Sequence, residues 1–246
     1  MIKIAVIEAR LFSTRLPGKV MMPLAGITML QHIIERVRRA KLVDKIIVAT
    51  TENPEDVVIE NLCHSLGVEV HRGANDNVMA RVLSATKDYK NSILVQITAD
   101  NPFIEAEIID KIIDASEDRK LDYICNHLPR NVPIGCVVRA YKRNTLDKLT
   151  GKVFSQNHKS NVTSIFYDNT KEYNVFNINT DKKYYGAHLR LTVDEPKDYF
   201  LATHLYNKFY KKKKYFSLAD IIKYLNKNIK LIRINENVNQ KSLKEG

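Results

Sequence analysis

Short runs of β-branched residues alternate with segments of helical periodicity through the first half of the chain, and this alternation limits the possible folds most strongly. The apolar runs predict strands over Ile2–Ile7, Lys45–Thr50, Val68–His71 and Ser92–Thr98. The segments after them predict helices over Thr28–Ala40, Asn53 to about Leu66, Asp76–Tyr89 and Glu105–Asp118. Four successive strand–helix units predict a doubly wound, mainly parallel α/β sheet with helices on both faces.

The pattern loosens from Asp122 to about Tyr185 and then returns to regular elements. Further strands are predicted over Tyr123–Asn126, Cys136–Tyr141, Tyr173–Ile178, His188–Val193 and Leu231–Ile234. Further helices are predicted near Lys142–Leu149 and over Glu195–Tyr210 and Ser217–Asn226. Since the chain has no internal repeat and no long linker, we expect a single domain over residues 1–246 with a β-rich segment inserted at 122–188.

Glycine is scarce, with 8 residues in a chain of 246. No two glycines have the GxG spacing, and none precedes a Gly-Lys pair by five positions, so the dinucleotide fingerprint and the Walker P-loop are both excluded. If the protein binds phosphates, its side chains must contribute more of the binding than they do in those motifs.

Cysteine usage and hydropathy predict the compartment. The 3 cysteines are odd in number and widely spaced, which fits neither a disulfide framework nor a zinc site. No apolar stretch approaches the roughly 18 residues of a membrane span, and the start of the chain lacks the apolar core of a signal peptide. We therefore expect a cytoplasmic protein without a membrane partner.

The net charge of +11 is concentrated at the end of the chain. Residues 203–246 contain 11 Lys and Arg against 3 Asp and Glu, and the first 202 residues are nearly neutral. Aromatic residues alternate with lysines in this tail, a pattern that nucleic-acid and membrane-surface elements share. The alternative, which we favour, is that the tail aromatics pack on the domain while the lysines face water, with no nucleic acid bound.

The loop after the first predicted strand collects cations and hydroxyls. It contains Arg10, Ser13, Thr14, Arg15 and Lys19. In an open α/β sheet, ligands bind beyond the carboxyl ends of the strands, where this loop begins. Arginine binds phosphate bidentately and lysine acts as a point charge, so the loop suits a triphosphate. The alternative is a solvated basic loop.

Two aspartates also stand at predicted strand ends. Asp100 follows Ser92–Thr98, and Asp194 follows His188–Val193. Carboxylates in such positions hold Mg²⁺, which takes oxygen ligands and bridges phosphates. Each aspartate taken alone is more often a helix N-cap.

Five blocks in this order resemble the SpsF-type cytidylyltransferases, which belong with the acylneuraminate and 3-deoxy-manno-octulosonate cytidylyltransferases that make CMP-sugars. The blocks are ARLFSTRLPGKVMMPLAG from residue 9, VATTENPED from 48, HRGANDNVMAR from 71, QITADNPFI from 96 and LRLTVDEPKDY from 189. They span about 200 residues. The resemblance implies a nucleotide-diphospho-sugar-transferase fold of the GT-A-like Rossmann type and a homodimer.

The same resemblance implies roles for individual residues. The CTP phosphates would be bound by Arg10, Ser13, Arg15 and Lys19. The base and the ribose would be contacted by Thr50, Thr51, Arg72 and Asn77. Mg²⁺ would be held by Asp100 and Asp194. Lys19, Arg15 and Asp100 would be the catalytic residues. A sugar hydroxyl would displace pyrophosphate from CTP and form the CMP ester. The CTP half would be 1–121, the acceptor or dimer segment 122–188, and the metal-ligand strand with the last helices 189–246.

The chain departs from the family pattern mainly in the acceptor half. Glu8 replaces a common glutamine in the CTP half, whereas acidic positions are replaced by Ile134, Val137 and Arg139, and a histidine by Asn161. These changes could alter or abolish activity. We expect an anionic acceptor such as a nonulosonic acid, which would be bound by basic residues of this half. For these residues, His127, Arg130 and Arg139, a structural or dimer-contact role is equally open.

Three alternatives to this function stay open. The enzyme could act on a sugar phosphate or a polyol phosphate. A metal-dependent glycosyltransferase of the same fold is possible, although the chain has no clear DxD motif. A basic nucleic-acid-binding protein is the third and weakest alternative.

Overall fold

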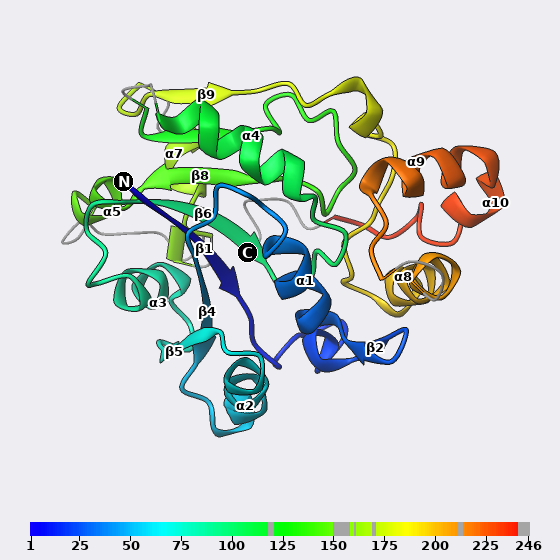
Figure 1. Cartoon of the computed structure of the whole chain (residues 1–246), viewed down its shortest axis with the longest axis horizontal. Coiled ribbons are helices and arrows are strands. Elements are labelled where there is room, and N and C mark those ends of the chain that lie inside the picture. Colours follow the sequence, from blue (N-terminus) through cyan, green and yellow to red (C-terminus); the bar gives the residue numbers. More distant parts are fainter. Residues whose placement is uncertain (118–120, 150–157, 160, 169–170, 211–213, 241–246) are drawn as a thin grey trace.

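The computed structural model describes residues 1–117, 121–149, 158–159, 161–168, 171–210 and 214–240. Seven strands form the main sheet in the order β5-β4-β1-β6-β8-β7-β9. Their bounds are β1 Ile2–Glu8, β4 Lys45–Thr51, β5 Glu69–Gly73, β6 Ser92–Thr98, β7 Tyr123–Cys125, β8 Arg139–Lys142 and β9 Val175–Asn177. β8 pairs antiparallel with both of its neighbours, and the other pairs are parallel. The predicted mainly parallel α/β fold is confirmed (Figure 1).

Helices cover both faces of this sheet (Figure 1). Their bounds are α1 Met29–Val37, α2 Val57–Ser65, α3 Val78–Ala85, α4 Ala106–Glu117, α5 Arg143–Asp147, α7 Ser164–Asp168, α8 Pro196–Phe209, α9 Leu218–Lys227 and α10 Ile229–Ile232. Short 3₁₀ turns lie at η1 Lys19–Met21, η2 Pro54–Asp56 and η3 Lys182–Tyr184, and a small hairpin joins β2 Pro23–Leu24 to β3 Ile27–Thr28.

Two apolar cores lie against opposite faces of the sheet. The larger core joins alternate residues of β1 and β6, such as Ile7 and Val95, to α1, α4, α8 and α9. The smaller core joins the intervening residues, such as Val6 and Leu94, to α3, α5 and α7. Because successive side chains of a strand point to opposite faces, these two buried sets explain the continuous apolar runs in the sequence.

Two of the predicted strands were wrong. Residues 188–193 form only an isolated parallel bridge between Arg190 and Ile134, because their backbone bonds go to single residues, Ile134 and Asp100, and not to the length of a neighbouring strand. The predicted edge strand Leu231–Ile234 is instead the end of the helix α10 and the turn after it. This helix closely follows α9 and packs against it. Both runs are rich in apolar and β-branched residues, and such a composition does not by itself distinguish a strand from another packed segment.

The other predicted elements are present with ends that shift by a few residues. Thr28 accepts a hydrogen bond from the Gln31 amide and caps α1, and Gly67 ends α2 in the left-handed conformation with φ of 61°. The tail aromatic residue Phe216 is buried, as expected from the packing alternative. In the described part of the chain, no helix combines the length and the apolar character that crossing a bilayer requires.

Candidate active site

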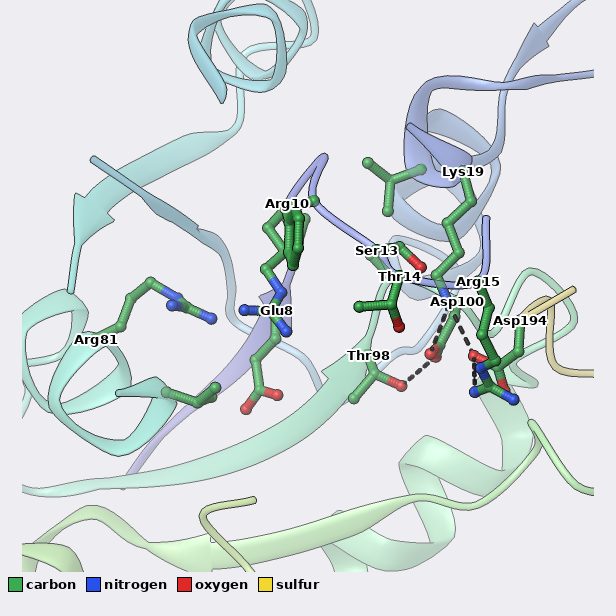
Figure 2. Close-up of a pocket in the computed structure, with 15 residues that line it drawn as sticks. Glu8, Arg10, Ser13, Thr14, Arg15, Lys19, Arg81, Thr98, Asp100 and Asp194 are labelled. Atoms are coloured by element: carbon green, nitrogen blue, oxygen red, sulfur yellow. Dashed lines mark hydrogen bonds and ion pairs between the residues drawn. The ribbon is translucent and has the colours of Figure 1, made fainter. Parts of the chain in front are cut away.

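The loop after β1 delivers a lysine into the molecule. Gly18 adopts a left-handed conformation, with φ of 69°, immediately before the turn η1, which begins at Lys19. The Lys19 side chain is nearly buried, and its ammonium donates to Val193 O at 2.8 Å, Asp194 Oδ1 at 2.9 Å and Asp100 Oδ2 at 3.3 Å. Burial alone would lower the pKa of Lys19, but the two carboxylates raise it above its usual value, so the side chain stays charged (Figure 2).

Asp100 follows β6 and is oriented from both sides. Thr98 donates its hydroxyl to Asp100 Oδ1 at 2.6 Å. The carbonyl of Asp100 accepts from the Val193 amide at 2.8 Å and from the Thr192 hydroxyl at 3.2 Å. These bonds tie the end of β6 to the segment that carries Asp194.

Asp194 is surrounded by cations. Arg15 Nη2 lies 3.0 Å from its Oδ1, and Arg190 Nη2 lies 2.9 Å from its Oδ2. Burial opposes the charge of this carboxylate, yet Lys19, Arg15 and Arg190 together hold the pKa of Asp194 below its usual value. Asp194 is therefore ionised at neutral pH.

A glycine permits the close approach of the segment that carries Asp194. Gly135 has φ of 94°, and a Cβ at this position would lie 2.4 Å from the amide nitrogen of Thr192. Any other residue would push residues 191–192 away from the end of the sheet.

Asp198 caps α8 and also fixes the segment that carries Asp194. It takes part in the capping box of α8, and its Oδ2 accepts from the amides of Asp194 and Glu195 at 3.0 Å each. Its Oδ1 also accepts from Arg190 Nε at 2.9 Å. Asp198 thus holds both the backbone and the arginine that position Asp194.

Two cavities meet at this cluster. The first has a volume of about 390 Å³ and the second about 550 Å³. Both are lined by a common set of residues: Glu8, Arg15, Thr98, Asp100 and Asp194. The first cavity lies between the loop after β1 and α3, and the second lies over β6 and β8. A ligand in one cavity is therefore adjacent to a ligand in the other.

The structure brings six of the predicted site residues to the first cavity. They are Arg10, Ser13, Arg15, Lys19, Asp100 and Asp194 (Figure 2). Lys19 and Arg15 pair directly with the carboxylates of this cavity, and Arg10 and Ser13 line it as well.

The predicted base and ribose residues line neither cavity. Thr50 is fully buried, and the Thr51 hydroxyl donates to Asp56. Arg72 donates to the carbonyl of Asn53 at 2.8 Å and pairs with Glu60. Asn77 Oδ1 accepts from the Ala80 amide at 2.9 Å and caps α3. A direct nucleotide contact by these four residues stays a prediction.

Several residues of the first cavity were not predicted from the sequence, among them the charged residues Glu8 and Arg81. Arg81 is 2% exposed and ends the block HRGANDNVMAR, and Glu8 had been noted only as a departure from the family. The alternation of side chains along β1 is a signal that could have identified Glu8. Ile4, Val6 and Glu8 share one face of the strand, and Glu8 is the polar residue at the carboxyl end of β1.

The second cavity contains the basic residues of the acceptor half. His127, Arg130, Arg139 and Asn161 line it with the substituted positions Ile134 and Val137. Arg130 donates to backbone carbonyls, which gives it a structural role, whereas the buried Nε of Arg139 has no hydrogen-bond partner among the described residues. Burial lowers the pKa of His127 to about 3, and the positive charges of Arg139 and Arg130 act in the same direction, so its imidazole is neutral.

The carboxylates suit a divalent cation. Asp100 and Asp194 both reach the Lys19 ammonium, which occupies the position of a cation between them. The described residues contain no group of three His, Cys, Asp or Glu side chains placed to hold a metal. Two carboxylates with remaining positions for water and phosphate oxygens are the donor set that Mg²⁺ typically takes.

A family model and one relative match most of the chain, and a further relative matches about half of it. A family model described as Cytidylyltransferase matches residues 4–230. The spore coat polysaccharide biosynthesis protein SpsF of Bacillus subtilis is 29% identical over 91% of this chain and 93% of its own length. The 3-deoxy-manno-octulosonate cytidylyltransferase of Trichlorobacter lovleyi is 34% identical over 45% of this chain and 43% of its own length.

A solved structure agrees with this relationship. The cytidylyltransferase from Leptospira borgpetersenii superimposes with a TM-score of 0.87 at 27% identity and covers 98% of this chain and 100% of its own. The resemblance seen in the sequence blocks, the fold and the family match all agree. The chain belongs to the cytidylyltransferase family, whose members are CTP-dependent nucleotidyltransferases.

Proposed function

We propose that this protein transfers CMP from CTP to an acidic sugar of the nonulosonic type and releases pyrophosphate, in the synthesis of a surface polysaccharide or glycoconjugate. The observation that carries the proposal is the wall shared by the two cavities, in which Asp100 and Asp194 lie beside Arg15. The first cavity would hold CTP and the second the acceptor, so that the reacting groups meet at this wall.

Charge neutralisation is the main task of the first cavity. CTP carries about four negative charges, and attack at its α-phosphorus requires that these be neutralised and the leaving pyrophosphate held in line. Lys19 and Arg15 would provide point and bidentate contacts to the phosphates, and Arg10 and Ser13 would extend the contacts along the loop.

The two carboxylates would hold Mg²⁺. When bound, this ion would neutralise phosphate charge and act as a Lewis acid. The residues of the chain would do the rest by positioning: Thr98 orients Asp100, and Arg190 with Asp198 orients Asp194. Such preorganised charges are the largest single contribution in many enzymes.

The second cavity would select an anionic acceptor. Arg139 and Arg130 both line it, and the buried Nε of Arg139 has no hydrogen-bond partner among the described residues. An acceptor carboxylate would give Arg139 the partner that a buried guanidinium requires. A hydroxyl of this sugar would form the new bond to the α-phosphorus as the bond to the pyrophosphate oxygen breaks.

Pyrophosphate release from CTP tests the acceptor class. We expect release with an acidic sugar and much less with the same sugar as its methyl ester, because the ester removes the charge and keeps the hydroxyls. The proposal is wrong if no acidic sugar supports release from CTP, or if the ester and a neutral sugar serve equally well. Sugar phosphates and polyol phosphates in the same panel test the alternative acceptors.

A further inference from the structure

The chain returns to the active site after its last helix. Beyond α10, residues 235–240 run back toward the sheet (Figure 1), and we call this segment the C-terminal strap. Its last residue, Gln240, lines the second cavity together with Arg15 and Asp194. The match to the family model ends at residue 230, so the strap lies outside it.

Asn235 anchors the strap in the interior. It is 2% exposed, and its Nδ2 donates to Asp198 Oδ1 at 2.8 Å and to the carbonyl of Arg190 at 3.1 Å. The amide of Val238 donates to the carbonyl of Asn235 at 3.1 Å and closes a turn. One buried side-chain amide therefore contacts both of the residues that orient Asp194.

Gln240 provides a further partner for Arg190. Nε of Arg190 donates to Asp198 at 2.9 Å, and Nη2 donates to Asp194 at 2.9 Å. The remaining nitrogen, Nη1, donates to Gln240 Oε1 at 2.6 Å. Because a guanidinium is a rigid planar fork, a partner on each of its three nitrogens fixes its orientation.

The strap also reaches the second arginine beside Asp194. Arg15 Nη1 donates to the carbonyl of Asn239 at 3.4 Å, while its Nη2 lies 3.0 Å from Asp194 Oδ1. Arg190 pairs with the other oxygen of this carboxylate, Oδ2, at 2.9 Å. Each oxygen of Asp194 is thus paired with a guanidinium that the strap contacts.

Partners of this kind determine how well a carboxylate is placed to hold a cation. Loss of a residue that orients a metal ligand typically costs about 10- to 100-fold in metal affinity or activity. Arg190 and Asp198 orient Asp194 directly, and the strap in turn fixes these two residues. The alternative is that the strap only fastens the end of the chain to the domain, in which case its contacts affect stability and not the site.

We propose that the C-terminal strap completes the active site by fixing Asp194 in position. Asn235 and Gln240 are the positioning residues, and they act through Arg190. This inference rests on the proposed function, in which Asp194 faces the CTP phosphates and would hold Mg²⁺. It adds to that function a segment that neither the loop after β1 nor the ends of the strands supply.

Calorimetric binding of CTP with and without Mg²⁺ tests the strap in the absence of an acceptor sugar. Gln240→Met keeps the length of the side chain and removes its amide, and the fold should survive because Gln240 is exposed. We expect the gain in CTP affinity on addition of Mg²⁺ to fall by roughly 10-fold, with the affinity in the absence of Mg²⁺ unchanged. Asn237→Ala is the matched control, since Asn237 is exposed in the same segment, and it should keep the wild-type gain.

A second measurement shows whether Gln240 acts through Arg190. Arg190→Lys keeps the positive charge and lacks the Nη1 donor, so adding Gln240→Met to this variant should cause little further loss of the gain. Full additivity of the two substitutions would overturn the route through Arg190.

The inference is also overturned if Gln240→Met keeps the wild-type gain, if it weakens CTP binding equally with and without Mg²⁺, or if the wild-type protein shows no gain. A smaller gain in Gln240→Met supports the strap even if no acidic sugar releases pyrophosphate, because no acceptor is present in these titrations. That last result would contradict the proposed acceptor alone.

Discussion

Lys19 and Asp194 lie 175 positions apart in sequence, and their side chains meet at 2.9 Å between Nζ and Oδ1. The same Asp194 oxygen is 3.0 Å from Arg15 Nη2. One carboxylate oxygen thus accepts from two cations that the proposed mechanism assigns to phosphates. A triphosphate that attracts Lys19 and Arg15 would free Asp194 for Mg²⁺, which connects nucleotide binding to the metal site.

Lys19→Ala should lower kcat for pyrophosphate release by at least roughly 10²-fold, because it removes a nearly buried charge that would neutralise the phosphates in the proposed mechanism. Steady-state kinetics with CTP and the acceptor measure this. The exposed Lys111, which pairs with Asp181, provides the control Lys111→Ala, which should retain the wild-type rate. Equal rates for the two variants would contradict the role of Lys19.

Asp100→Asn should raise the Mg²⁺ concentration needed for half-maximal activity, since an amide is a weaker and uncharged ligand. A chelator should abolish pyrophosphate release by the wild-type enzyme, and added Mg²⁺ should restore it. Titration of Mg²⁺ with Asp181→Asn as the surface control measures the shift. If Asp100→Asn needs the same Mg²⁺ concentration as the wild-type enzyme, Asp100 is not a metal ligand.

Arg190→Ala should destabilise the fold by about 3–5 kcal/mol, because it leaves the buried carboxylates of Asp194 and Asp198 without their shared partner. Urea unfolding measures this. Lys183→Ala removes an exposed partner of Glu107 and should cost at most about 1 kcal/mol. A similar small cost for Arg190→Ala would show that Arg190 does not hold the site together.

The raised pKa of Glu8 should make the free energy of unfolding depend on pH. Burial raises the pKa of Glu8 from 4.5 to about 7, against the opposing effects of Arg81, Gln96 and Arg139, while Asp100 raises it further. The folded state then binds the Glu8 proton more tightly than the unfolded state. The stabilisation of the folded state by the protonated Glu8 is fully present below about pH 4.5 and is lost as the pH rises through about 7.

Urea unfolding of wild-type protein and Glu8→Gln between pH 4.5 and 7 isolates this contribution. The wild-type free energy of unfolding should fall relative to that of Glu8→Gln as the pH rises, by about 1–3 kcal/mol over the interval. A constant difference between the two proteins would show that the pKa of Glu8 is unperturbed by folding.

Arg139→Ala should raise KM for an acidic acceptor by roughly 10-fold or more and leave KM for CTP within about twofold, since Arg139 lines only the second cavity. Kinetics with each substrate varied in turn separate the two effects. Equal increases in both KM values would place Arg139 in a general structural role.

The sequence predicted the parallel half of the sheet because β1, β4 and β6 are apolar runs bounded by helix signals. It also placed Lys19 and Asp100 at one edge, since the carboxyl ends of parallel strands meet there. Asp194 reaches the same edge on a segment that is not a strand. The prediction failed at residues 188–193, where the strand-like pattern belongs to a segment that forms only an isolated bridge, between Arg190 and Ile134. Burial alone produces that pattern in both cases.

The position of a side chain within the edge was harder to predict. Thr50 and Thr51 stand at the end of β4, but Thr51 donates to Asp56 and neither residue lines a cavity. Glu8 reaches the cavity because its side chain lies on the same face of β1 as Val6, and because it is paired with Thr98 of β6. The alternation along β1 is visible in the sequence, but only the assembled sheet provides the register with Thr98. The homodimer and the cytoplasmic location stay predictions.

Pyrophosphate release from each of the four nucleoside triphosphates, in the presence of an acidic sugar and Mg²⁺, tests most directly that the two cavities form one cytidylyl-transfer site. We predict release with CTP, little with the other three, and loss of release in Asp100→Ala. A preference for UTP or GTP would contradict the assignment of the base, and release that survives Asp100→Ala would contradict the assignment of the site.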